Sequence, residues 1–226
     1  MVDFKQKQEL IAYLSDYVTE NKINKIEEVL LKRTRHVAIV LEDIFQVHNA
    51  SAVVRSAECF GIQDIHIIEK RNKFLPNNTI ARGAVKWMNL HKYKSTSDCI
   101  KALKETGYKV VATTPHKKSI ELHELDIDKK VALLFGTEAL GLSDEALELA
   151  DEYVTIPMFG FTESFNISVS VALCLYDITN RLRNSDIHWQ LSKEEMLDTK
   201  LNWIRNVVRA SEIHEKQFFA DKVKKS

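Results

Sequence analysis

Polar side chains lead into the longest apolar stretch of this chain, in the segment Gly160-Phe-Thr-Glu-Ser-Phe-Asn-Ile-Ser-Val-Ser170. Ser164 and Asn166 stand where a capping side chain accepts hydrogen bonds from the backbone amides that a first helical turn leaves unpaired. A helix start of this kind can also hold a polar ligand group. The segment therefore predicts a helix over residues 166–182 that begins either at a simple cap or at a binding site.

A second candidate is the segment Leu134-Phe-Gly-Thr-Glu-Ala-Leu-Gly-Leu142, in which an apolar strand runs into Gly136. Glycine lets another group approach the backbone closely, and ligands of open α/β sheets bind beyond the carboxyl ends of strands. The same residues also fit an ordinary strand-to-helix turn. The sequence has no GxGxxG and no Walker motif, which argues against a phosphate site for a dinucleotide or a nucleoside triphosphate.

The third candidate is Arg55, which falls among alanines and valines in a helix predicted over residues 49–60. A buried guanidinium is costly, so Arg55 should either pair with Glu58 or Asp64 or face a functional cleft. Asn49 lies six residues upstream, less than two helical turns away. It is interpreted as the N-cap of this helix, or as a second member of the same cleft.

Short apolar strands alternate with helices through the middle of the chain, which predicts an α/β fold with a mostly parallel sheet and helices on both faces. The strand at 131–135 is apolar throughout and should be central. Helical patterns precede and follow this region, so we expect an N-terminal extension at 1–35, a main domain at 36–184 and a C-terminal tail at 185–226. The other expected strands are 37–41, 65–68, 87–93, 109–113 and 153–156, and the other expected helices are 96–105 and 143–150.

The composition of the chain limits the classes of function that it can have. The 226 residues include 32 basic and 32 acidic side chains, so any affinity for nucleic acid must come from local patches. Three scattered cysteines, Cys59, Cys99 and Cys174, form no zinc pattern and are interpreted as buried thiols of a reducing compartment. The N-terminal thirty residues are too charged for a signal peptide, and no apolar run approaches a membrane span. We therefore expect a cytoplasmic protein without a metal or a membrane partner.

In this order and spacing, the three candidate segments resemble the SpoU (TrmH) family of RNA ribose 2′-O-methyltransferases. The resemblance runs from about Arg35 to Arg183, and the helical ends look like those of the tRNA-modifying branch. It implies a trefoil knot in the C-terminal half of the domain, a homodimer, and S-adenosylmethionine bound in a bent shape within the knot. For the TrmH branch it implies methylation of the ribose 2′-hydroxyl of a D-loop guanosine, at tRNA position 18.

The resemblance also assigns roles to residues. Two basic positions, Arg181 and Arg183, match residues that contact tRNA, although cations at a helix C-terminus are favourable in any case. Positions that surround the cofactor match Thr113, Gly136, Ile156 and Phe165. The catalytic positions match Arg55, Asn49, Glu138, Ser164 and Asn166.

The resemblance implies that Arg55 activates the ribose hydroxyl. Arginine is a poor general base, however, because its guanidinium stays protonated. Two readings remain. Arg55 is deprotonated transiently by a special environment, or it stays cationic, grips an RNA phosphate and stabilises the developing alkoxide. We favour the second reading on energetic grounds.

Three alternatives stay open. A ribosomal RNA 2′-O-methyltransferase of the same family would keep the chemistry and change the substrate. A non-catalytic RNA-binding relative is disfavoured because the expected catalytic positions are intact. An α/β enzyme for an unrelated small molecule is what the physical pattern alone allows.

If the substrate is RNA, we expect phosphate contacts from the helical ends and from a region containing Arg71, Lys73, Arg82 and Lys86.

Overall fold

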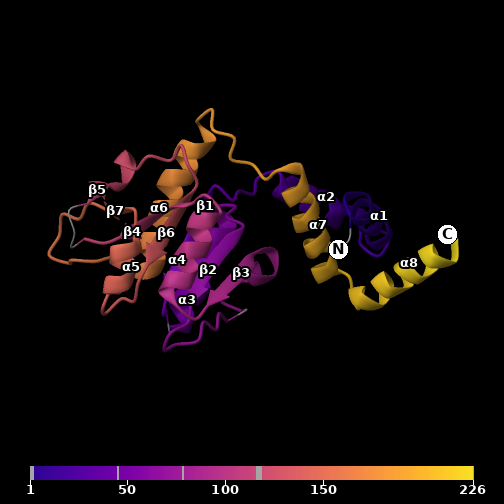
Figure 1. Cartoon of the computed structure of the whole chain (residues 1–226), viewed down its shortest axis with the longest axis horizontal. Coiled ribbons are helices and arrows are strands. Elements are labelled where there is room, and N and C mark those ends of the chain that lie inside the picture. Colours follow the sequence, from indigo (N-terminus) through magenta and orange to yellow (C-terminus); the bar gives the residue numbers. More distant parts are fainter. Residues whose placement is uncertain (1–2, 45, 78, 116–118, 226) are drawn as a thin grey trace. The chain divides into compact units, whose positions relative to one another are not determined.

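The sheet consists of seven strands that pair in parallel throughout the described chain. The computed structural model describes residues 3–44, 46–77, 79–115 and 119–225, with side chains as far as Lys222. The strand order is β3-β2-β1-β6-β4-β7-β5 (Figure 1). The strands are β1 (Val37–Glu42), β2 (Asp64–Ile68), β3 (Asn89–Tyr93), β4 (Lys109–Thr113), β5 (Ile120–Glu121), β6 (Val131–Phe135) and β7 (Glu152–Thr155).

The centre of the sheet is buried on both faces, as the uninterrupted apolar runs predict. Every residue of β1, β2 and β6 is buried. Strand β6 is the fourth of the seven, which confirms its predicted central place. The predicted bounds of β4 and β6 match the structure, and the prediction of an α/β fold with a parallel sheet is confirmed.

Helices cover both faces of the sheet. On one face α3 (Val47–Cys59) and α6 (Ile167–Arg183) pack against each other and against alternate residues of the strands, for example Ile39 and Leu133. On the other face α4 (Thr96–Glu105) and α5 (Asp144–Leu149) cover the intervening positions, such as Val40 and Leu134. The period of two along each strand thus divides one sheet into two apolar cores.

Helix caps account for most of the helix starts in this region. Ser143 caps α5 by accepting from the amide of Ala146, and Asn166 caps α6 by accepting from Ser168. Both caps were predicted. The prediction that Asn49 caps its helix is wrong, because α3 starts earlier, with Gln46 at the N-cap. Asn49 therefore lies within the first turn, and its side chain is available for other contacts.

A few local predictions need correction. Cys59 is exposed, so only Cys99 and Cys174 are buried thiols, and burial raises the pKa of each of these two to about 12. The predicted strand at 87–93 begins later, because residues Ala84–Trp87 form a 3₁₀ turn. A second 3₁₀ turn (Leu122–Glu124) and strand β5 were not predicted, since both are too short to show a repeating apolar pattern.

Within the described part of the chain, no helix is long and apolar enough to cross a membrane.

The chain divides into two compact units, residues 34–189 and residues 1–33 together with 190–226. The second unit holds α1 (Phe4–Ser15), α2 (Glu20–Leu30), α7 (Lys193–Val207) and α8 (Ser211–Lys225). Its core includes Leu10 and Leu14 of α1 and Leu201 and Ile204 of α7, which form the apolar stripes expected from their helical spacing. The two ends of the chain thus fold together in one helical unit.

At the end of β1, the carboxylate of Glu42 ties two helices to the sheet. It accepts hydrogen bonds from the Ser143 amide (2.8 Å), the Ser143 hydroxyl (2.7 Å) and the Thr96 hydroxyl (2.6 Å). Burial by itself opposes ionisation of this side chain, but these hydrogen bonds and the nearby Lys70 outweigh it and lower the pKa of Glu42. The starts of α4 and α5 are therefore fixed to β1 by one charged group.

Replacing Glu42 by Gln should lower the free energy of unfolding by about 1.5–3 kcal/mol at neutral pH, the usual range for hydrogen bonds to a charged group. Because the folded-state pKa of Glu42 lies below its ordinary value of 4.5, this stabilisation is present above that value and is lost as the pH falls through the folded-state pKa. Urea unfolding of both proteins at neutral pH and at successively lower pH should show the difference shrinking. Glu105→Gln, at an exposed position of α4, is the control and should change little. A difference independent of pH would contradict this account.

Candidate active site

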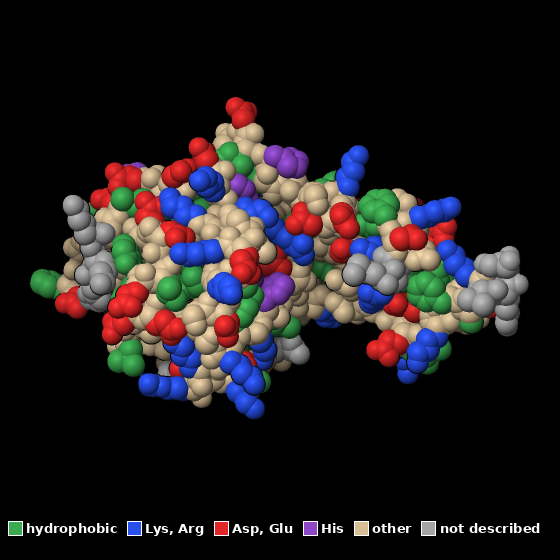
Figure 2. Space-filling model, in the orientation of Figure 1, with side chains coloured by type: hydrophobic (Ala, Val, Ile, Leu, Met, Phe, Trp, Pro, Cys, Tyr) green, Lys and Arg blue, Asp and Glu red, His purple; other side chains and the backbone are tan. Residues whose placement is uncertain are grey.

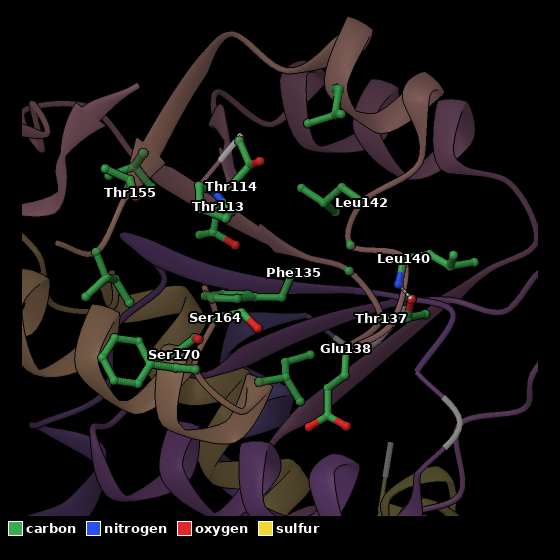
Figure 3. A pocket seen from close by; sticks show the side chains of 18 of the residues that line it. Thr113, Thr114, Phe135, Thr137, Glu138, Leu140, Leu142, Thr155, Ser164 and Ser170 are labelled. Atoms are coloured by element: carbon green, nitrogen blue, oxygen red, sulfur yellow. Dashed lines mark hydrogen bonds between the residues drawn. The ribbon is translucent and has the colours of Figure 1, made fainter. Parts of the chain in front are cut away.

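A cavity of about 390 Å³ opens beyond the carboxyl ends of β4, β6 and β7, which are neighbours around β4 in the sheet. Its volume lies within the range of small-molecule sites. The segments that follow these three strands form its walls, together with the first turn of α6 (Figure 3). Its lining is Thr113–Pro115, Phe135–Leu142, Asp144, Leu147, Val154–Ile156, Met158, Ser164, Phe165, Ile167 and Ser170.

The segment after β6 folds back on itself to form one wall. Thr137 and Gly141 exchange two backbone hydrogen bonds of 3.0 and 2.8 Å, and the Leu140 amide donates to the Thr137 hydroxyl (Figure 3). A Cβ on Gly136 would lie 2.1 Å from the backbone carbon and oxygen of Gly141. The glycine is therefore needed for the close approach of the chain to itself, a reason that the sequence pattern did not reveal.

Three polar side chains from distant segments meet beside this wall. The Oε1 atom of Glu138 accepts from the side-chain amides of Asn49 (2.9 Å) and Asn166 (2.5 Å). The Asn166 amide also donates to Oδ1 of Asn49 (3.1 Å). We call this set of three residues the amide–carboxylate junction. It joins the start of α3, the start of α6 and the segment after β6, and all three residues were predicted as catalytic.

The junction is further oriented by its surroundings. Asn49 is 7% exposed, and its amide donates to Gln46 at 2.6 Å. Oδ1 of Asn166 accepts from the backbone amide and the hydroxyl of Ser168. These bonds fix which end of each amide is the donor, so the two donors converge on the carboxylate.

The four predicted cofactor positions, Thr113, Gly136, Ile156 and Phe165, all line the cavity, as does Ser164. The hydroxyl of Thr113 donates to the backbone oxygen of Leu134, which joins β4 to β6 beside the cavity.

The sequence analysis did not predict several of the residues that line the cavity. The signal that could have found Thr114, Leu142 and Met158 is their position directly beyond strand ends or in the segments that follow them.

The structure does not bring Arg55 to the cavity. Arg55 is exposed on α3 and lines neither this cavity nor the small one of about 10 Å³ beside Asn49. Six helical positions rotate a side chain by about 120° relative to Asn49, so the two residues point in different directions. The expected alternative partner, Asp64, instead pairs with Arg35 at 2.9 Å. Arg55 therefore faces solvent in the single chain.

The two arginines at the end of α6 make intramolecular contacts. Arg181 pairs with Asp177 at 2.9 Å and donates to the backbone oxygens of Leu125 and Leu122. Arg183 is exposed, donates to the Phe60 oxygen, and its guanidinium lies 5.6 Å from the ring centroid of Trp189. Arg183 is therefore the more accessible of the two for a ligand.

A parallel sheet with a cavity at its carboxyl edge, bordered by converging amides and a carboxylate, defines an α/β enzyme with a small-molecule site. Comparison with protein families makes the class specific. Residues 36–176 match the model described as the SpoU rRNA Methylase family. The chain belongs to this family.

This chain is similar to known proteins of the family over most of its length. A tRNA (guanosine(18)-2′-O)-methyltransferase from Borreliella burgdorferi is 47% identical over 88% of this chain and 91% of its own length. The crystal structure of the A. aeolicus TrmH/SpoU tRNA modifying enzyme matches with a TM-score of 0.76 and 29% identity, covering 84% of this chain and 98% of that one. The SpoU methyltransferase AviRb from Streptomyces viridochromogenes, solved in complex with the cofactor AdoMet, shares the fold at 20% identity, with a TM-score of 0.60 over 70% of this chain and 65% of its own.

The contact between Gly136 and Gly141 generates a stability prediction. Gly136→Ala should lower the free energy of unfolding by about 1–3 kcal/mol or more, because its Cβ would overlap backbone atoms that cannot move independently. Gly160→Ala is the matched control, since its Cβ would meet nothing closer than 4.0 Å, and it should stay within about 0.5 kcal/mol of the parent. Urea unfolding measures both. Equal stability of the two variants would show that the wall tolerates a side chain.

Proposed function

We propose that this protein transfers a methyl group from S-adenosylmethionine to the ribose 2′-hydroxyl of guanosine 18 in the D loop of tRNA. The observation that carries this proposal is the 47% identity, over nearly the whole chain, to a protein named for that activity. The amide–carboxylate junction and the adjoining cavity supply matching chemistry within the same chain.

The cavity fits the proposed cofactor by size and by the character of its walls. Phe135, Leu142, Ile156 and Phe165 offer apolar surface for a nucleobase, and Gly136 and Gly141 of the turn also line the cavity. Thr113 of β4 and Ser164 of the segment before α6 also line the cavity. When bound, S-adenosylmethionine supplies a methyl group that its sulfonium already makes electrophilic.

The main task of the protein is therefore to position the hydroxyl in line and to help remove its proton. Orientation alone can supply roughly 7–11 kcal/mol in favourable cases. The amide–carboxylate junction keeps the two helix starts and the cofactor wall in a fixed relation, and Ser164 presents a hydroxyl at the cavity. These residues thus orient the reactants without themselves changing charge.

Arg55 acts on the ribose side of the reaction. An exposed guanidinium stays protonated, which favours the cationic reading over transient deprotonation. Its planar donors hold an RNA phosphate in two parallel hydrogen bonds and stabilise negative charge as it develops on the ribose oxygen. The phosphate or a water molecule then takes the proton.

A homodimer would complete the site. On α6 the side chains of Val169, Leu173 and Tyr176 are exposed at spacings of four and three residues, so they form one apolar stripe. Ser170, beside this stripe, lines the cavity. A second copy seated on α6 would bury the stripe and cover the cavity rim, where its own exposed Arg55 could reach.

The proposal extends to the knot and the domain roles. Strand β7 lies on the far side of β4 and β6 from β1, yet α6, which follows β7, packs against α3, which follows β1. This return path across the strand ends supports a trefoil knot formed by the C-terminal half of the 36–184 domain. The terminal segments 1–35 and 185–226, together with Arg181 and Arg183, would hold tRNA through its phosphates. Because its substrate is tRNA, the reaction belongs in the cytoplasm.

The direct test is transfer of a labelled methyl group to an unmodified tRNA transcript, with the product mapped by nucleotide. A ribosomal RNA fragment serves as the competing substrate. Label on the ribose of guanosine 18 is the expected result. Label confined to the ribosomal RNA would keep the chemistry and replace the substrate, and no transfer despite cofactor binding would favour the non-catalytic alternative.

Arg55→Lys should lower kcat by more than about tenfold, because lysine lacks the planar pair of donors that holds a phosphate and the developing oxyanion together. Binding of S-adenosylmethionine should be unchanged, since Arg55 lies outside the cavity lining. Arg71→Lys is the matched control: it is also exposed, and a phosphate contact there needs only positive charge. Turnover of Arg55→Lys close to that of the parent would contradict both readings of Arg55.

A further inference from the structure

Asp43 adopts an unusual backbone conformation immediately after β1. Its φ of 56° is in the left-handed region, which is unfavourable for a residue with a side chain. Aspartate tolerates this conformation better than most residues. The conformation persists where the surroundings hold it, so the contacts of Asp43 indicate what it does.

The Asp43 side chain holds the segment that follows β2. Its Oδ1 atom accepts from the backbone amides of Arg71 and Asn72, each at 2.8 Å. The Asn72 side chain donates back to the Asp43 carbonyl oxygen at 3.2 Å, and the Asp43 amide donates to Ile68 at the end of β2. We call this set of contacts the Asp43 clamp. It fixes a loop whose length and composition alone would leave it free to move.

Two further anchors continue the hold along the same loop. The amide of Phe74 donates to Glu69 at 2.9 Å, and the Phe74 ring is buried in the core under α3. The amide of Asn77 donates to the hydroxyl of Ser51, a fully buried residue of α3, at 2.8 Å. The backbone is therefore held at three points, while the side chains of Arg71 and Lys73 in the held segment are exposed.

The far end of the clamped loop contacts the helix that carries Arg55. Asn77 is bonded to Ser51, which lies one helical turn before Arg55 on α3. In Figure 2, Lys and Arg side chains gather at the lower edge of the sheet unit, where Figure 1 places the segment between β2 and β3. Lys70 is already held by Glu42 and Glu145, so Arg71 and Lys73 supply the accessible positive charge of the part held by the Asp43 clamp.

We propose that Asp43 is a positioning residue for RNA: by clamping the loop, it presents Arg71 and Lys73 to the phosphates that flank the ribose at Arg55. This inference rests on the proposed function. A charged side chain on an ordered backbone loses less conformational freedom when it binds, so the clamp raises affinity without touching the RNA. Because the chain has no net charge, its affinity for RNA must come from local groups of basic side chains such as these.

Two substitutions at Asp43 separate the clamp from the backbone conformation. Asp43→Gly keeps the left-handed backbone, since glycine adopts it freely, but removes the acceptor. Asp43→Asn keeps both an Oδ1 acceptor and tolerance of positive φ. We expect Asp43→Gly to raise the Kd and the KM for tRNA about tenfold, with kcat and S-adenosylmethionine affinity unchanged, and Asp43→Asn to restore most of the affinity.

The double variant Arg71→Ser/Lys73→Ser checks the same idea with Asp43 intact. It should weaken tRNA binding and reduce the slope of log K against log salt by roughly 1–2, one unit or less for each lost phosphate contact. Filter binding over a salt series measures this slope, and thermal unfolding of each variant is recorded beside it.

The inference would be overturned by wild-type tRNA affinity in Asp43→Gly, by an equal loss in Asp43→Asn, or by an unchanged salt slope in the double variant. A parallel loss of S-adenosylmethionine affinity in Asp43→Gly would also overturn it, because the role would then be structural. If the parent protein transfers methyl groups to tRNA while these results fail, only the clamp is wrong. If the parent protein transfers none, the proposed function is wrong, whatever the variants show.

Discussion

One carboxylate, that of Glu138, is the constraint on which the candidate site depends. It accepts from Asn49 at the start of α3 and from Asn166 at the start of α6. Both helices pack against each other on the same face of the sheet, with Ala50 and Ile167 near their starts in one core. Asn49 is buried, and a buried polar group is costly unless it is hydrogen-bonded, so its bond to the exposed Glu138 favours one position of α3 relative to the cavity wall.

At the end of β1, two adjacent residues each hold another segment of the chain in place. Glu42 points to the face covered by α4 and α5 and fixes Ser143, directly after the turn that closes the cavity wall. Asp43 holds the basic loop after β2. Glu42 is the last residue of β1, whereas Asp43 follows the strand with a φ of 56°, so the left-handed backbone and not strand alternation sets the direction of its side chain. One strand end can therefore position a cofactor wall and an RNA-facing loop independently.

Much of this arrangement could be predicted from the sequence. Apolar runs and cap residues predicted the strands and most helix bounds, the capping pattern indicated Asn166, and the family resemblance pointed to Glu138. What the sequence could not supply was side-chain direction. A helix start displaced by two residues turned Asn49 from a cap into a partner of Glu138, and the exposed direction of Arg55 depends on how α3 is rotated on the sheet. The clamp at Asp43 depends on a positive φ that composition does not encode.

The central claim is that the ribose hydroxyl of guanosine 18 is the acceptor of the methyl group. The most direct measurement compares two tRNAs that differ only at that nucleotide, one with ribose and one with 2′-deoxyribose, using labelled S-adenosylmethionine. The account predicts that the first is labelled and that the second, although bound with similar affinity, is not. Equal labelling of both tRNAs would contradict it, because the methyl group would then be attached to another atom.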